Sequence, residues 1–175
     1  MAIILVLCKI RNHVASARYE VHITTALHNT QMAVGKLDGT GHKILVIDDD
    51  LAIRVLLQAV LRRMKFEVTL AEDGAVGLDR LNQDGEFDLI LLDLMMPRVN
   101  GYEFIERIKD VLPHGRPHII VFTAAGKRGV DKIPADAVCN AILKPFDLEK
   151  FIEMIAECLR GPHNGQNAQS VPPPA

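Results

Sequence analysis

The sequence predicts an α/β domain built on a five-stranded parallel sheet, doubly wound in the strand order 2-1-3-4-5, with helices on both faces. Two observations support this fold class. Short apolar runs recur along the chain, and the four aliphatic residues 89–92 form a run that is too uniformly apolar to leave one side in water. Amphipathic stretches separate these runs, and parallel strands need such crossover connections. The expected strands are residues 43–47, 67–71, 88–92, 118–122 and 141–143.

Apolar residues at helical spacing define the connections between the strands. This pattern is strong at residues 53–64, 104–112 and 148–159, and weaker at residues 74–83. Asp147 is a suitable N-cap for the last helix. The segment 124–140 contains two glycines and a proline, which leave room for only a short or broken helix.

Composition separates three regions of the 175-residue chain. Residues 43–160 carry the α/β pattern and are expected to form the domain. Residues 1–42 are expected to be an N-terminal extension that is disordered or reflects a misassigned start codon, with residues 1–31 dispensable for folding. Residues 161–175 contain no Asp, Glu, Lys or Arg and end in a proline run, which is typical of a disordered tail. We expect the domain to act alone, since only this tail follows it.

Charge and cysteine usage narrow the expected partners and compartment. The formal net charge of −2 gives no sign of a nucleic-acid or membrane surface, so we expect neither partner. No apolar run approaches the roughly 20 residues of a membrane helix. Three cysteines without a CxxC pair suit a reducing compartment, which indicates the cytoplasm. We expect Cys139 and Cys158 to pack in or near the core, and His114 and His118 to be exposed rather than to bind a metal.

Charged and hydroxyl side chains directly follow four of the predicted strands. The first strand is followed by Asp48, Asp49 and Asp50, the third by Asp93, the fourth by Thr123 and the fifth by Lys144. In a doubly wound sheet, binding residues gather at the carboxyl ends of the strands near the topological switch point, here between strands one and three. We therefore expect these side chains to lie together at one edge of the sheet.

At least three carboxylates converge in this arrangement. Two unit charges about 4 Å apart repel by roughly 4 kcal/mol at an intermediate dielectric, and raised pKa values or a bound cation relieve that repulsion. An all-oxygen site with few protein ligands suits Mg²⁺, which keeps several waters and bridges to phosphate. With Lys144 and Thr123 beside it, Asp93 is then predicted to be a nucleophile that accepts a phosphoryl group as an acyl phosphate.

Four segments, ILVIDDD, LILLDLMMPRVNGYEF, VFTA and LKPF, resemble the signatures of the receiver domain of bacterial two-component response regulators. The resemblance covers about residues 43–160, and it is specific because the four segments occur in order at compatible spacings. It implies a flavodoxin-like fold and a phosphoacceptor for a histidine kinase or a histidine phosphotransfer protein. It also implies signalling by phosphorylation-dependent binding to a downstream protein, and not an enzyme with a separate substrate.

The resemblance assigns roles to individual residues. Asp93 is the phosphoacceptor, and Thr123 and Lys144 contact the phosphoryl group. The Mg²⁺ ligands that it implies are Asp48, Asp49, which binds directly, Asp93 and the backbone carbonyl of Met95. It further implies a cis peptide bond between Lys144 and Pro145.

Ala141 is a departure from the family, which usually carries Tyr or Phe three residues before the lysine. A methyl group cannot swing inward as that ring is thought to do, so the output surface is where this chain differs most from the family. Three alternatives stay open: a phosphorelay shuttle to a histidine phosphotransfer protein, a degenerate receiver that binds partners without phosphorylation, and a phosphatase of the haloacid-dehalogenase type. The phosphatase would need a second aspartate where Met95 stands.

Overall fold

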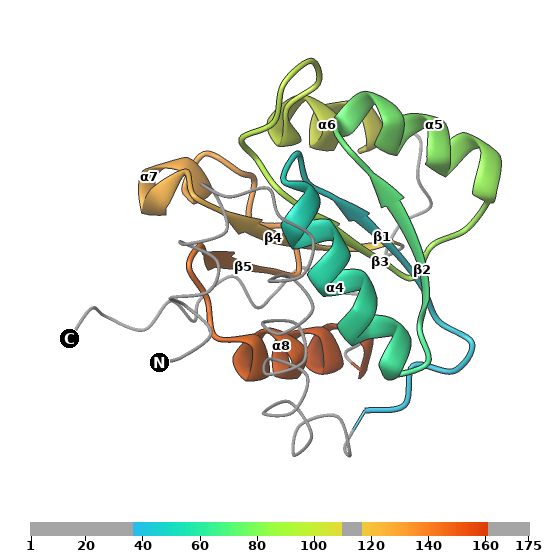
Figure 1. The fold of residues 1–175 in the computed structure, drawn as a ribbon. Helices are drawn as coiled ribbons and strands as arrows, with labels where there is room; N and C mark the ends of the chain where they lie inside the picture. The colour runs from blue at the N-terminus through green and yellow to red at the C-terminus, as the bar shows by residue number, and fades with distance from the viewer. Residues whose placement is uncertain (1–36, 110–116, 161–175) are drawn as a thin grey trace.

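The computed structural model describes residues 37–109 and 117–160, which form one parallel sheet and the helices that cover it (Figure 1). The strand order β2-β1-β3-β4-β5 confirms the predicted fold class. The strands are β1 (Lys43–Ile47), β2 (Glu67–Ala71), β3 (Leu89–Leu92), β4 (His118–Thr123) and β5 (Asn140–Leu143). The helices are α4 (Leu51–Arg63), α5 (Gly74–Asp84), α6 (Gly101–Ile108), α7 (Gly126–Val130) and α8 (Leu148–Arg160).

The register of the sheet aligns the carboxyl ends of its strands. In β1, Ile47 pairs with Ala71 of β2 on one side and with Leu92 of β3 on the other. Leu92 pairs in turn with Val121 of β4, and Thr123 closes the pairing of β4 with β5. The residues that follow the strands therefore emerge at the same edge.

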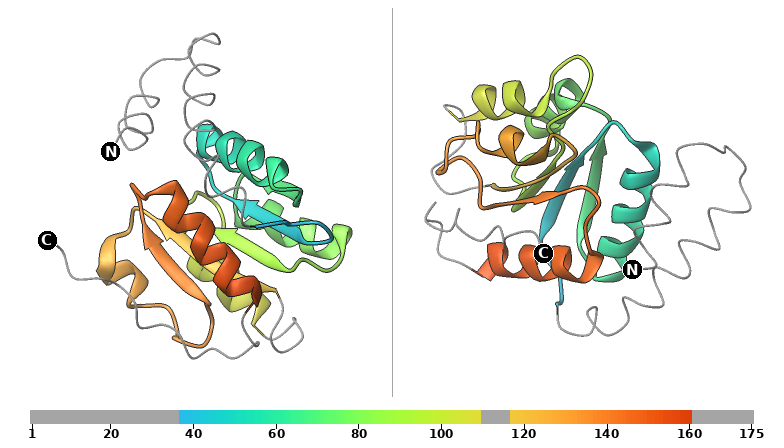
Figure 2. Two further views of the ribbon diagram at one scale, coloured as in Figure 1. Left: turned by 90° about the horizontal axis from the view of Figure 1, so that it is seen from below. Right: turned by 90° about the vertical axis from the view of Figure 1, so that its left-hand side faces the viewer.

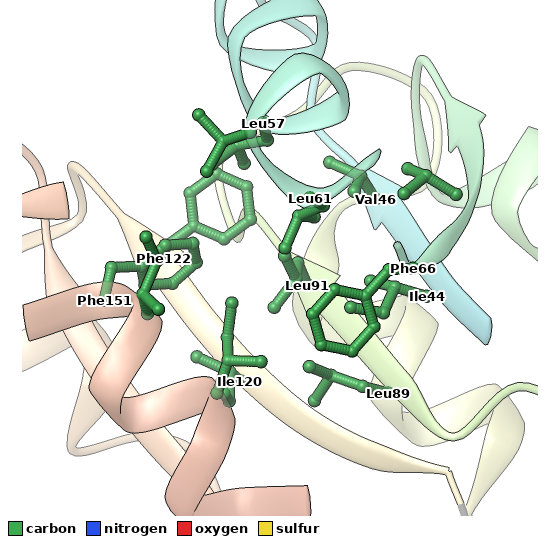
Figure 3. Packing of buried hydrophobic residues seen from close by; sticks show 14 of the residues in the cluster. Ile44, Val46, Leu57, Leu61, Phe66, Leu89, Leu91, Ile120, Phe122 and Phe151 are labelled. Carbon is green, nitrogen blue, oxygen red and sulfur yellow. The ribbon is translucent and has the colours of Figure 1, made fainter. Parts of the chain in front are cut away.

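Two hydrophobic clusters, one on each face of the sheet, hold the helices in place. Helices α4 and α8 lie on one face and α5 and α6 on the other (Figures 1 and 2). Successive strand residues alternate between the faces, so Leu91 points toward α4 and α8, whereas Leu92 packs with α6. Leu91 lies among the aromatic and aliphatic side chains of the first cluster (Figure 3). It is fully buried, and burial of such a side chain contributes about 1.5–3 kcal/mol.

Side-chain caps fix where the helices begin. The carboxylate of Asp50 accepts a hydrogen bond from the Ala52 N–H at the start of α4, and Asp147 accepts from the N–H groups of Glu149 and Lys150 at the start of α8. The predicted N-cap of the last helix is therefore confirmed. The third acid after β1 is a helix cap. The short helix expected within 124–140 is α7, which has no side-chain cap.

Several expectations lie at or beyond the limits of the described residues. Residues 1–36, 110–116 and 161–175 lie outside them, and with them His114, the end of the expected helix 104–112 and the expected disordered tail. Residues 37–42 pack on the domain, since Leu37 contacts the first cluster and the Gly39 N–H donates to the Met64 carbonyl over 2.8 Å. Among the residues described, none of the helices combines the length and apolar character required to cross a bilayer.

The cysteines and His118 differ in part from expectation. The structure joins Cys139 and Cys158 in a disulfide with a Cα–Cα distance of 6.2 Å, whereas their number and spacing favoured free thiols. Both pack in or against the first cluster, as expected. His118 is the partly buried first residue of β4 and is not in an exposed loop. Sequence spacing could not reveal that Cys139 and Cys158 meet, because only the tertiary fold brings α8 beside the start of β5.

Candidate functional site

The predicted site residues lie just beyond the strands because the sheet hydrogen bonding continues past the strand ends. The Asp48 N–H donates to the Ala71 carbonyl over 3.2 Å, and the Asp93 N–H donates to the Ile47 carbonyl over 2.9 Å. The Lys144 N–H donates to the Thr123 carbonyl over 2.8 Å. Each side chain is therefore held by backbone contacts that do not depend on a ligand.

Lys144 joins two of the carboxylates directly. Its Nζ lies 2.6 Å from Asp48 Oδ2 and 2.7 Å from Asp93 Oδ2. The Lys144 side chain is only 15% exposed, and Asp48 and Asp93 are buried. The ammonium also lies 4.8 Å from the centre of the Phe122 ring, an apolar wall that limits access of water. The bond between Lys144 and Pro145 is cis, as expected.

A third carboxylate completes an acidic cluster at this edge. One oxygen from each of Asp48, Asp49 and Asp93 lies within 4.8 Å of the other two, and Asp49 is exposed. With all three ionised, Lys144 offsets one of three negative charges and leaves a net charge of −2. Mg²⁺ binds oxygen at about 2.0–2.1 Å and takes few protein ligands, so the donor set and spacing suit this ion.

Burial changes the protonation of the cluster. Desolvation raises the pKa of Asp48 to about 6; the adjacent Lys144 opposes this shift and the negative charge of Asp93 adds to it. Desolvation alone would lower the pKa of Lys144, but the attraction of Asp48 and Asp93 outweighs it and raises that pKa. The ammonium therefore stays charged at neutral pH, while Asp48 titrates only about one pH unit below neutrality.

This raised pKa predicts a pH dependence of folding. An acid whose folded pKa exceeds its unfolded value binds more protons when folded, so its contribution to stability falls as pH rises between the two values. The difference between 3.8 and about 6 corresponds to about 3 kcal/mol. Asp48→Asn lacks this titration. Without divalent cations, its free energy of unfolding should therefore rise by up to about 3 kcal/mol relative to that of the parent between pH 4 and pH 7. Urea unfolding across this range measures the difference, and a difference independent of pH would contradict the assignment.

The two remaining site residues, Met95 and Thr123, each take part in a hydrogen bond with a backbone N–H group as the donor. The Met95 N–H donates to Asp93 Oδ1 over 3.2 Å, so the Met95 peptide lies directly beside the carboxylate, while its side chain is 58% exposed. Thr123 is fully buried at the end of β4, and its Oγ1 accepts from the Ala125 N–H over 3.2 Å. The structure thus groups Asp48, Asp49, Asp93 and Lys144 by the distances between their side chains. The Met95 N–H contacts this group, and the Thr123 hydroxyl is held at the end of β4 by the Ala125 N–H.

Two contacts that support the site gave no signal in the sequence. Arg98, in the loop after Asp93, has a φ of 62° and forms ion pairs with Glu72 and with the fully buried Asp73, which also caps α5. Tyr102 of α6 donates its hydroxyl to the Gly129 carbonyl of α7 over 3.0 Å. The first contact anchors the loop between Asp93 and α6, and the second connects α6 to the segment after Thr123.

Comparison with known proteins adds independent information to this geometry. Residues 44–156 match the family model described as "Response regulator receiver domain". Among solved structures, the response regulator protein TrrA of Thermotoga maritima, in complex with Mg(2+)-BeF, is similar with a TM-score of 0.58 and 28% identity, covering 67% of this chain and 98% of TrrA.

Two curated relatives are longer than this chain. The transcriptional regulatory protein CpxR of Escherichia coli (strain K12) is 33% identical over 130 residues, which cover 74% of this chain and 54% of CpxR. The DNA-binding transcriptional regulator NtrC of Bradyrhizobium sp. (strain RP501 Parasponia) is 36% identical over 120 residues, which cover 68% of this chain and 24% of NtrC. The chain thus spans about half the length of CpxR and about a quarter of NtrC.

These names correct one expectation about partners. We expected no nucleic-acid partner, but the relatives are a transcriptional regulatory protein and a DNA-binding transcriptional regulator. The expectation is wrong because it rested on the net charge of this stretch, which says nothing of what the relatives carry beyond the matched region. The expectation of a domain that acts alone rested on where the given sequence ends, and it is not carried further because the relatives extend beyond the matched region.

Proposed function

The chain belongs to the response regulator receiver domain family, and from this premise we propose that it accepts a phosphoryl group on Asp93 in a two-component pathway. The observation that carries the proposal is Lys144, whose partly buried ammonium contacts the carboxylates of both Asp48 and Asp93. A structural ion pair needs only one carboxylate. A lysine between two carboxylates, with a third beside them, suits a site that will hold further charge.

The proposed step is nucleophilic displacement at phosphorus. An oxygen of Asp93 attacks the phosphohistidine of a kinase or phosphotransfer protein. The O–P bond forms, the P–N bond breaks, and the imidazole leaves with its electron pair. Lys144 shifts from the carboxylate to a phosphoryl oxygen, and the Thr123 hydroxyl donates to another. Charge then develops against groups that are already in place, which is the largest source of stabilisation in such reactions.

A divalent cation fits the same account. Mg²⁺ would be held by Asp48, Asp49, Asp93 and the Met95 backbone carbonyl, and when bound it neutralises charge on the phosphoryl oxygens. Asp49 suits direct ligation because it is exposed, whereas both oxygens of Asp48 already accept hydrogen bonds, from the Asp50 N–H and from Lys144. The test is intact mass after incubation with a small phosphodonor. We expect a gain of one phosphoryl group with Mg²⁺ and none with a chelator; no gain in either sample favours a degenerate receiver.

The phosphoryl group is proposed to be long-lived on this chain. Hydrolysis needs a water aligned with phosphorus, and the side chains two residues beyond Asp93 and Thr123 are Met95 and Ala125, which cannot hydrogen-bond it. The same absence of an acid or base at Met95 disfavours a phosphatase with turnover. The domain is therefore proposed to be a phosphoacceptor, not an enzyme with a released substrate. We also propose a cytoplasmic location, because the proposed phosphohistidine donor is made from ATP.

A substitution at Met95 tests this account of the lifetime. Met95→Asn should speed loss of the phosphoryl group by about tenfold, equivalent to about 1.4 kcal/mol, because the amide can orient the attacking water. Met95→Leu is the matched control and should keep the parent rate. Loss of phosphoryl mass is followed after removal of the donor. An unchanged or slower rate in Met95→Asn means that this side chain does not control the water.

The output is proposed to pass through the segment after Thr123. Ala141 packs against the cluster of the second face and supplies no ring that could change position. Helix α7 is short and is connected to α6 by the Tyr102 hydroxyl. A phosphoryl group that draws in Thr123 would therefore act by ordering the residues just after it. The names of the relatives support a DNA-binding unit as the target of this surface.

Hydrogen exchange tests where the response occurs. Ordering costs roughly 1–2 kcal/mol of backbone entropy per residue, so the phosphoryl contacts can order only a few residues. With Mg²⁺ and a non-hydrolysable phosphoryl mimic, protection should rise in residues 124–132 and hardly change in α8. Uniform protection, or none beyond the acidic cluster, would instead favour a phosphorelay shuttle whose surface barely responds.

A further inference from the structure

A second group of ligating side chains lies away from the acidic cluster. One ligand atom from each of His118, Cys139 and Cys158 lies within 4.8 Å of the other two. They come from the first residue of β4, the residue before β5 and the last helix, α8. The Cys139 N–H donates to the Ile119 carbonyl over 2.8 Å, which holds Cys139 beside the start of β4. The backbone thus fixes two of the three groups.

This group plays no part in the proposed phosphotransfer. His118 begins β4 and Thr123 ends it, so the five intervening steps place the two sites about 17 Å apart. Helix α8, which carries Cys158, lies along β4 and β5 (Figure 2).

The chemistry of the three groups is selective. Two thiolates and an imidazole are preferred ligands of Zn²⁺, at about 2.3 Å for sulfur and 2.0–2.1 Å for nitrogen. Tetrahedral geometry then separates the ligand atoms by about 3.6–3.8 Å. The three ligand atoms already lie within 4.8 Å of one another, and reduction of the disulfide frees the two sulfurs to move apart to that separation. The Cα–Cα distance of 6.2 Å also lies within the range of disulfides.

We propose that Cys139 and Cys158, when reduced, bind Zn²⁺ together with His118, with water in the fourth position. His118 and Cys139 are only partly buried, which leaves solvent access to the ion, and Cys158 is buried behind them. The disulfide and the ion are alternative occupants, because a metal needs both sulfurs as thiolates. Either one connects α8 to the sheet.

A cobalt titration tests the site in the full chain. All variants carry Cys8→Ser, so that Cys139 and Cys158 are the only thiols. A phosphine reductant converts the disulfide and one water into two thiols and a phosphine oxide, and excess Mg²⁺ occupies the acidic cluster. Co²⁺ is then titrated in before any Zn²⁺ is added. We expect one equivalent to bind with a sulfur-to-cobalt charge-transfer band, and Zn²⁺ to displace it.

Variants distinguish a metal site that includes His118 from metal binding by the two thiols alone. Cys158→Ser should abolish the band, and His118→Gln should weaken affinity by more than about 100-fold, since loss of an outer-shell partner alone costs about 10–100-fold. His42→Gln, a histidine outside the group, is the matched control and should titrate like the parent. Zn²⁺ should raise the unfolding temperature of the parent but not of His118→Gln, and metal-free unfolding shows that each variant folds. Absence of the band in the reduced parent, or an unchanged affinity in His118→Gln, would overturn the proposal.

Discussion

Replacing Asp93 with asparagine is expected to abolish phosphorylation while the domain stays folded. The amide is nearly the same size and can still accept the hydrogen bond from the Met95 N–H, but it has no carboxylate oxygen to attack phosphorus. It also removes one negative charge from a buried cluster, so the unfolding temperature should not fall by more than a few degrees. Intact mass after incubation with Mg²⁺ and a small phosphodonor measures the effect.

The chain offers a matched control for this variant. Asp50→Asn makes the same chemical change two residues after Asp48, at a carboxylate that caps α4. It should gain the phosphoryl group as the parent does, because asparagine also serves as an N-cap. A mass gain that persists in Asp93→Asn would remove Asp93 as the acceptor. If Asp50→Asn loses the mass gain as completely as Asp93→Asn does, the effect of Asp93→Asn cannot be assigned to the missing nucleophile, because a change outside the site has the same result.

The second large effect is expected at Lys144. Lys144→Gln should slow phosphorylation by about 100-fold or more, since loss of one preorganised donor to a developing oxyanion costs about 10²–10³ in rate. The same change leaves the buried Asp48 and Asp93 without their cation. Loss of one partner of a buried ion pair costs about 3–5 kcal/mol, an amount that protonation of Asp48 should reduce.

Mg²⁺ separates the two consequences of this substitution. It should stabilise Lys144→Gln more than the parent, because the ion replaces part of the missing positive charge, yet it should not restore the rate. Lys150→Gln is the control, since Lys150 is exposed on α8. A phosphorylation rate like that of the parent in Lys144→Gln, with Mg²⁺ present, would remove this lysine from the phosphoryl site.

Sequence reasoning was strongest where the geometry of a parallel sheet determines the position of a residue. Once β1, β3, β4 and β5 are placed, the residues after them must emerge at one edge, and the distances around Lys144 follow from that edge. It was weaker where one local role competes with another. Asp50 follows Asp48 and Asp49 in the chain, yet its carboxylate caps α4 and is not part of their cluster.

Contacts between distant segments could not be predicted. Arg98 with Asp73, and the Tyr102 hydroxyl with the Gly129 carbonyl, join residues whose neighbours carry no pattern that pairs them. The grouping of Cys139 and Cys158 is of the same kind, because it depends on how α8 lies on the sheet. Local periodicity predicts which face of an element is buried, and leaves open which polar side chains meet across elements.

Borohydride trapping tests the central claim most directly, since it identifies the residue that carries the acyl phosphate. The reagent reduces an acyl phosphate to an alcohol and releases phosphate, so an aspartyl phosphate becomes homoserine. After treatment with a small phosphodonor and Mg²⁺, reduction and peptide mass mapping should find homoserine at position 93 alone, and chelation of Mg²⁺ should prevent it. Homoserine at another position, or a phosphoryl group that survives reduction on a histidine, would contradict the account.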